Sequence, residues 1–250
     1  MEIPDALANG GAVVVDENTD FEVATEFTVL GDKAAMTLGQ GSKTVVEKFT
    51  VAAGRSFEMQ FGDKAKTTEL KNLDLADKDS KLSLSGGKVD VDVLDKSTAG
   101  TSKGTLQLSG ETELSGQTGK YLIEVTEHVS GAAKAEIGDL ETAGDIVGDG
   151  ELAIKGAGKK LKMTGVKTRV GPKLTVEPNG EFQSTSDDFQ ADKVAIKGRF
   201  KVKDNSVNDE GKNVVTEIEE CPAGGEVILE VTDVTNFATS KSKTVFRYDP

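Results

Sequence analysis

The chain has 250 residues, of which 36% are hydrophobic, and its 43 acidic and 30 basic residues give a net charge of −13. This apolar share is enough for a packed core, whereas a single His and a single Cys exclude a disulfide scaffold and a His- or Cys-based zinc or haem site. The negative charge disfavours nucleic acid and anionic membrane surfaces as partners, since both are themselves negative.

The first residues carry no targeting signal. Residues 1–17 contain no Lys or Arg, and their longest aliphatic run is Ala12–Val15. A secretory signal needs a basic start and a longer apolar run, and a membrane span needs about 20 apolar residues. We therefore expect a soluble chain with neither an export signal nor membrane insertion.

Alternation of apolar and polar residues runs through most of the chain and predicts β-strands with one buried face. The clearest strands are predicted at 21–23, 26–29, 81–85, 88–93, 105–108, 173–177, 199–203 and 226–231. Pro178-Asn179-Gly180 is the strongest hairpin signal, because Asn-Gly supplies the positive φ angles of a tight turn. We expect an all-β fold of antiparallel, sandwich- or barrel-like sheets. A β-solenoid is the alternative, because it too reads as many short alternating strands.

Short internal repeats occur in two parts of the chain. Phe27-Thr28-Val29 recurs as Phe49-Thr50-Val51, and a Gly/Met/Gly pattern at 31–39 recurs at 54–62. This spacing of 22 to 23 residues is the length of one hairpin or of one solenoid turn. Weaker matches are Ala-Ile-Lys-Gly at 153–156 and 195–198, and Leu-Ser-Gly beginning at Leu84, Leu108 and Leu114.

The phenylalanines divide the chain into three regions. Five lie between Phe21 and Phe61, five lie between Phe182 and Phe246, and none lies between these groups. We therefore expect a Phe-containing region at 1–62, an aliphatic Gly/Ser-rich module at 63–181 and a second Phe-containing region at 182–250. The first and third regions are candidates for packing together, since aromatic side chains bury the most area each.

Catalytic patterns are weak. The only His, His128, shares a predicted strand face with Glu124 and Thr126, as a solvated strand histidine would. Cys221 follows two Glu residues, which raise the pKa of a thiol and make it a poor nucleophile. The glycine-rich run 156–160 lacks the spacing of a phosphate-binding loop. A hydrolase that uses carboxylates alone is compatible with so many acidic residues, but sugar sites normally offer Trp or Tyr, which are nearly absent here. We expect no enzymatic activity.

Calcium is the only metal that the composition suits, because calcium takes oxygen ligands from loops. The candidates are Asp74, Asp77 and Asp79, and the acidic stretch 204–209. Neither fits the EF-hand pattern, and both read more simply as polar turns. We therefore expect no cofactor, with Ca²⁺ as the remaining possibility.

Charge is segregated into blocks. Residues 136–151 contain acids and no bases, residues 152–176 contain bases and no acids, and residues 204–230 are again acidic apart from Lys212. Complementary blocks suit contacts between subunits, and they equally suit pairing within one chain. The candidate interface residues are Glu136, Asp139, Glu141, Asp145, Asp149, Lys155, Lys159, Lys160, Lys162, Lys167, Arg169 and Lys173.

These features favour a non-enzymatic structural or assembly protein that associates with itself or with other structural subunits. A virion component assembled in the cytoplasm (capsid decoration, spike or tail part) fits best. A filament or layer subunit at the cell surface is the second setting. A ligand-binding β module or adhesin is the alternative function, followed by the carboxylate-only hydrolase.

Overall fold

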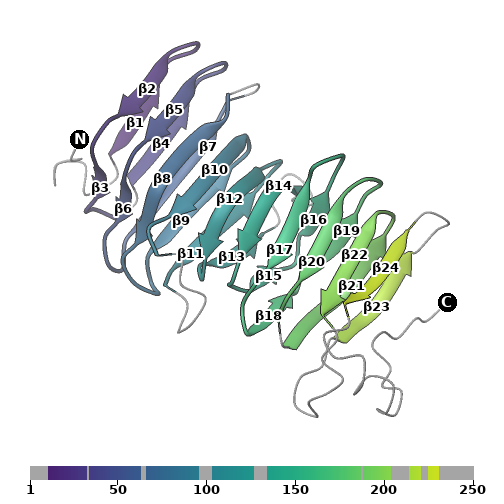
Figure 1. The fold of residues 1–250 in the computed structure, drawn as a ribbon. Coiled ribbons are helices and arrows are strands. Elements are labelled where there is room, and N and C mark those ends of the chain that lie inside the picture. Colours follow the sequence, from purple (N-terminus) through teal and green to yellow (C-terminus); the bar gives the residue numbers. More distant parts are fainter. Residues whose placement is uncertain are drawn as a thin grey trace.

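The computed structural model describes residues 11–32, 34–62, 66–95, 103–126, 134–186, 188–203, 214–220 and 225–230, and every regular element among them is a β-strand. All strand pairs are parallel. The chain winds through successive turns of a β-solenoid, and the strands stack into three faces, as Figure 1 shows. The all-β prediction is confirmed. The prediction of antiparallel sheets is wrong, and the solenoid alternative is the fold.

The first face contains β1 (Ala12–Val15), β4 (Ala34–Leu38), β7 (Ser56–Phe61), β9 (Lys81–Ser85), β11 (Thr105–Ser109), β13 (Leu122–Val125), β15 (Ile146–Gly148), β18 (Lys167–Val170) and the first parts of β21 (Asp188–Ile196) and β23 (Val214–Glu220). The second face contains β2 (Asp20–Val23), β5 (Lys43–Val46), β8 (Thr68–Leu75), β10 (Lys88–Val93), β12 (Glu113–Gly119), β14 (Lys134–Thr142), β16 (Glu151–Ile154), β19 (Lys173–Val176) and the end of β21. The third face contains β3 (Phe27–Val29), β6 (Phe49–Val51), the ends of β8, β12 and β14, and β17 (Lys160–Met163), β20 (Glu181–Ser184), β22 (Arg199–Lys203) and β24 (Glu226–Glu230).

Alternation misled the choice of sheet type because it is a property of one strand and says nothing about its neighbour's direction. Pro178-Asn179-Gly180 illustrates the error. Asn179 does adopt a positive φ of 66°, but the turn joins β19 to β20, which do not pair with each other. These strands pair instead with β16 and β17 of the preceding turn. The turn is therefore a corner of the solenoid rather than the tip of a hairpin.

The sequence repeats mark residues that stack on each other. Phe27, Thr28 and Val29 lie in register with Phe49, Thr50 and Val51. The Met36 and Met59 of the second repeat are also partners, and so are Leu84 and Leu108 of the Leu-Ser-Gly matches. The Ala-Ile pairs at 153 and 195 lie in one column, separated by Thr175 and Val176 of β19. Leu114 starts a strand on a different face and does not share the Leu84 column.

A single hydrophobic core runs along the axis of the solenoid, built from the inward residue of each alternating pair. Leu, Ile and Val fill the middle turns. Phe27, Phe49 and Phe57 cluster in the first turns, and Phe182, Phe189 and Phe200 cluster in the last. The first strands and the last strands lie at opposite ends of the rod in Figure 1. The three regions expected from the Phe pattern are thus consecutive parts of one stack.

Tyr121 is the aromatic side chain of the middle turns. Its ring is buried, its hydroxyl accepts a hydrogen bond from the Leu75 N–H at 2.9 Å, and it donates one to the Leu73 carbonyl at 3.1 Å. The strand β8 turns a corner here at Asn72, which has a positive φ of 48°. The phenol therefore satisfies backbone groups beside an irregular corner, and burial raises the pKa of Tyr121 to about 12.

Candidate functional site

Charged side chains on the outer faces form ladders that run along the stack. Lys160, Glu181, Arg199 and Glu226 occupy one column of the third face, in register from β17 to β24. Their contacts measure 2.9 Å from Lys160 to Glu181, 3.6 Å from Glu181 to Arg199 and 3.1 Å from Arg199 to Glu226. The signs thus alternate from turn to turn, and Glu181 meets a cation on both sides.

This two-sided pairing changes the acidity of the inner carboxylates. The hydrogen bond from Lys160, aided by Arg199, holds the pKa of Glu181 below its ordinary value despite partial burial. Glu113 on β12 sits between Lys88 at 2.9 Å and Lys159 at 2.5 Å. Burial opposes the ionisation of Glu113, but the hydrogen bonds from Lys159 and Lys88 outweigh it, so the pKa of Glu113 is lowered.

The predicted interface residues take part in these ladders. Two acids of the 136–151 block bind bases of the following block: Glu136 pairs with Lys155, and Glu141 pairs with Lys162 at 2.9 Å. Asp139 lies in register with Lys160, and the carboxylate of Asp145 accepts a hydrogen bond from the Arg169 backbone N–H at 2.8 Å. Asp149 is exposed in the turn between β15 and β16.

The remaining bases of the predicted interface reach acids outside the 136–149 candidates. Lys159 and Lys160 bind Glu113 and Glu181, and Arg169 binds Asp192 at 2.9 Å. Lys167 lies 3.9 Å from Asp188, and Lys173 is in register with Glu151. The charge blocks therefore pair extensively within one chain, turn against turn.

Sequence reasoning missed Glu113, Glu181, Asp188 and Asp192 as partners of the basic block. Block composition treats a segment as one charge, whereas the solenoid pairs residues about one turn apart, or two turns apart for Lys159 and Glu113. The signal that could have found them is the repeat spacing, because residues at that separation occupy the same column. Lys160 and Glu181, for example, are register partners on adjacent strands.

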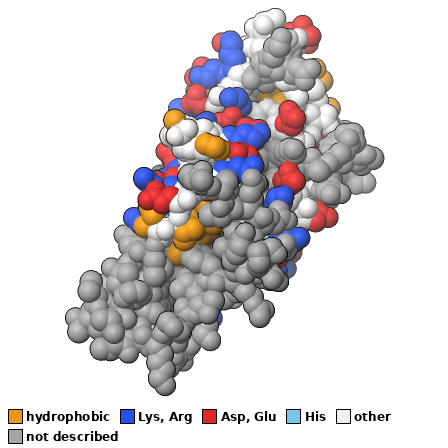
Figure 2. Space-filling view, turned by 90° about the vertical axis from the view of Figure 1, so that its right-hand side faces the viewer, with side chains coloured by type: hydrophobic (Ala, Val, Ile, Leu, Met, Phe, Trp, Pro, Cys, Tyr) orange, Lys and Arg blue, Asp and Glu red, His pale blue; other side chains and the backbone are white. Residues whose placement is uncertain are grey.

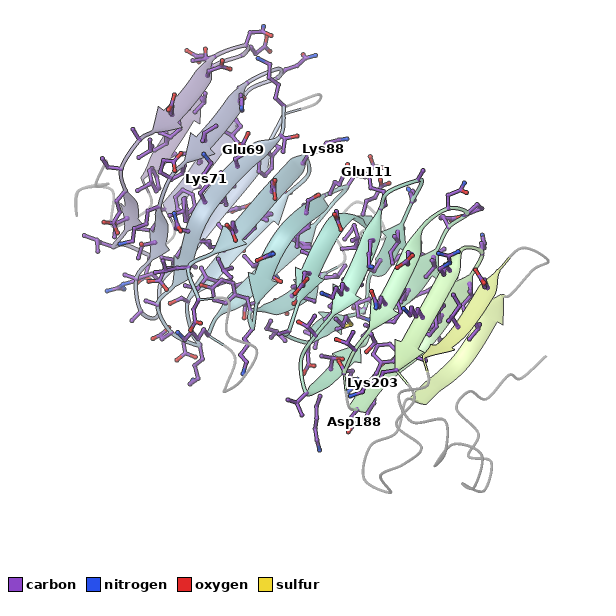
Figure 3. All side chains as sticks on the ribbon, viewed as in Figure 1. Glu69, Lys71, Lys88, Glu111, Asp188 and Lys203 are labelled. Atoms are coloured by element: carbon purple, nitrogen blue, oxygen red, sulfur yellow. The ribbon has the colours of Figure 1, made fainter. Side chains whose placement is uncertain are left out.

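The same rule holds nearer the start of the stack. Figure 3 labels Glu69 and Lys71 on β8, and both reach back to the preceding turn, to Lys43 at 3.0 Å and Glu47 at 2.7 Å respectively. Figure 2 shows the outcome on one face, where acidic and basic side chains are interspersed over the described surface. Such exposed pairs contribute little stability individually.

The first turn differs from the inner turns because it has a neighbour on one side only. Among the described residues, β1, β2 and β3 pair with β4, β5 and β6 and with no other strand. This turn also contains acids and no bases: residues 11–32 include no Lys or Arg. Asp20 lies opposite Lys43, Glu26 binds Lys48 at 2.9 Å, and Asp32 binds Arg55 at 2.7 Å. We call the backbone edge of β1, β2 and β3 that faces away from β4, β5 and β6 the acidic edge.

The metal and catalytic candidates have structural explanations or lie outside the described residues. Asp77 accepts hydrogen bonds from the backbone N–H groups of Gly54 and Asp79 and from the Ser80 hydroxyl, and the Gly54 contact contributes most to its lowered pKa. Within the described ranges, no group of three or more His, Cys, Asp or Glu residues is arranged to hold a metal ion. His128, Cys221 and the 204–209 stretch lie outside the described residues.

Of the glycine-rich run 156–160, residues 156–159 lie in the turn between β16 and β17, where Gly156 and Gly158 have positive φ angles, and Lys160 begins β17. The described part of the chain contains no helix long and apolar enough to cross a membrane. Comparison with models of known families, with curated proteins and with solved structures finds no match to this chain.

Proposed function

We propose that the chain is a non-enzymatic structural protein that assembles through the ends of its solenoid. The observation that carries this proposal is the acidic edge, where, among the described residues, β1, β2 and β3 pair with strands on one side only. Exposed strand edges are templates for further pairing. A second chain can therefore extend the stack with the same hydrogen bonds that build each turn.

The sides of the molecule support the same role. Many of their charged side chains bind opposite charges on neighbouring turns, and the core is continuous from the first described strand to the last described turns. A stack of this kind resists bending because each turn is bonded to its neighbours on three faces. Such a rod suits a virion part (capsid decoration, spike or tail component) assembled in the cytoplasm, or a filament or layer subunit at a cell surface.

The test is size-exclusion chromatography with light scattering on the full chain at low and at high salt. We expect oligomers at low salt that dissociate as salt rises, because exposed charge pairs are screened over roughly 8–10 Å at physiological ionic strength. A monomer at both salt concentrations would overturn the assembly role and would favour a ligand-binding β module. Oligomers that are insensitive to salt would support assembly through an apolar contact instead.

A further inference from the structure

The acidic edge has a natural partner within the structure itself, namely β5. Strand β5 reads Lys43-Thr44-Val45-Val46 and pairs in parallel with β2, placing Lys43 opposite Asp20, Thr44 opposite Phe21 and Val46 opposite Val23. Thr44 and Val46 face the core, while Lys43 points outward and binds Glu69 of the following turn at 3.0 Å. This strand defines the sequence pattern that fits against β2.

The same pattern occurs once more, in a part of the chain that lies outside the described residues. Ser242-Lys243-Thr244-Val245 repeats Ser42-Lys43-Thr44-Val45 residue for residue, and Phe246 follows where Val46 follows in β5. Residues 240–248 also contain three bases, Lys241, Lys243 and Arg247, and no acid. Residues 231–241 lie between β24 and this segment in the sequence.

We propose that residues 242–246 of one copy bind as a parallel strand to the open side of β2 in a second copy. This inference rests on the assembly role proposed above and names the contact that produces it. Lys243 would lie beside Asp20 on the side opposite Lys43, and Phe246 would cover Val23 and the partly buried Phe21. Strand addition of this kind gains main-chain hydrogen bonds, while the side chains set the register.

The charge ladders show that the chain already uses this arrangement. Glu181 is held between Lys160 on the preceding turn and Arg199 on the following one, at 2.9 and 3.6 Å. Asp20 has Lys43 as its register partner and binds Lys66 at 3.4 Å, and among the described residues no strand pairs with the other side of β2. A Lys243 from the next copy would complete the same alternation of signs at the acidic edge.

Charge also determines which surface cannot be the partner. The last described turn, like the first, contains acids and no bases, since residues 214–230 include no Lys or Arg. Direct stacking of that turn on the first turn of another copy would place acids opposite acids, and like charges directly opposite destabilise a strand pair. The basic 242–246 segment removes this conflict. The 242–246 segment and the acidic edge are different surfaces of the molecule. The proposed contact is therefore head-to-tail and leads to open chains of subunits.

The experiment uses the full chain and two charge reversals, Asp20→Lys and Lys243→Glu. Each variant alone should associate roughly tenfold more weakly than the wild type, because one attractive cross-strand pair becomes repulsive. An equimolar mixture of the two should recover assembly, since each edge then meets a segment of opposite charge. Glu58→Lys on β7 makes the same charge change away from the acidic edge and should assemble like the wild type.

Light scattering measures the association, and circular dichroism checks that each variant folds. Wild-type-like oligomers in both single variants would overturn this contact while leaving the assembly role intact. A mixture that stays monomeric although both variants are folded would also overturn it, because binding of the segment within its own chain predicts no rescue. A wild-type chain that is monomeric throughout would overturn both proposals.

Discussion

The aromatic and aliphatic parts of the core solve the same packing problem in different ways. In the first turns, the Phe27 and Phe49 rings stack 5.2 Å apart, and Phe57 meets both edge-on from the first face. In the last turns, Phe182 and Phe200 stack at 4.6 Å and Phe189 approaches from the first face. The middle turns use columns of aliphatic residues such as Leu82, Leu106 and Ile123.

This difference lies in how each turn fills its section of the core. A middle turn is covered on both sides by neighbouring turns, so a column of branched aliphatic side chains fills the section. The strands that carry Phe49, Phe182 and Phe200 also have partners on both sides, so coverage alone does not distinguish them, but a ring buries more area per residue than an aliphatic side chain does. The two clusters have the same plan, two rings from the third face and one from the first, although their sequences differ. The core therefore depends on column position more than on local sequence.

The largest expected effects come from truncating one buried side chain in each kind of turn, a ring in the first turns and a leucine in the middle turns. Phe49→Ala should lower the free energy of unfolding by about 3–5 kcal/mol, because Phe49 contacts two other rings and is fully buried. Leu106→Ala, in an aliphatic column, should lower the free energy of unfolding by an amount near the lower end of about 2–5 kcal/mol. The residues on the adjacent turns can relax into the smaller cavity. Chemical denaturation measures both.

Hydrogen exchange then locates the damage. Exchange should rise in β3, β6 and β7 for Phe49→Ala and in β9, β11 and β13 for Leu106→Ala, because each turn contacts its neighbours only. Equal losses spread over the whole chain would show that the two regions do not differ in this way.

Particular residues show how far the sequence could lead. The Phe27–Val29 repeat predicted a spacing that the structure confirms as stacking, because identical residues one turn apart occupy one column. The Asn179-Gly180 turn was equally clear locally, yet its flanking strands pair with other turns, since a positive φ angle fixes a bend and not a partner. The charge blocks predicted pairing but not the partners Glu113 and Glu181, which are set by three-dimensional register.

Substitution of Tyr121 tests whether the stability of the aliphatic middle turns depends on this buried phenol. Tyr121→Phe keeps the ring but leaves the Leu75 N–H and the Leu73 carbonyl without this partner. Removing one member of a buried hydrogen bond costs about 1–3 kcal/mol, so the free energy of unfolding should fall by that amount. Tyr121→Leu would lose both ring and hydroxyl and should cost more. A Phe variant as stable as the wild type would mean that the corner at Asn72 is held by packing alone.

Glu113 and Glu26 extend the comparison to the surface. Glu113 in an inner turn binds two lysines, and Glu26 in the first turn binds Lys48 and is more exposed. The pKa of Glu113 is lowered in the folded state, so its ionised form contributes stability above the ordinary Glu pKa of about 4.3, and this contribution is lost as the pH falls through the lower folded pKa. Glu113→Gln should therefore destabilise the protein at pH 7 by no more than about 1 kcal/mol, because solvent screens the pairs, and should have little effect near pH 2.

The Glu26→Gln variant is the matched control for this pH dependence. The Lys48 hydrogen bond, with help from Thr50, lowers the pKa of Glu26, and the Glu26 side chain is 42% exposed whereas that of Glu113 is 16% exposed. Its substitution should change the free energy of unfolding at pH 7 less than Glu113→Gln does. Urea denaturation at pH 7 and at low pH measures both variants. An equal change in the free energy of unfolding at the two sites would mean that the second lysine beside Glu113 adds no stability. The alternating charges would then chiefly select the register of neighbouring strands.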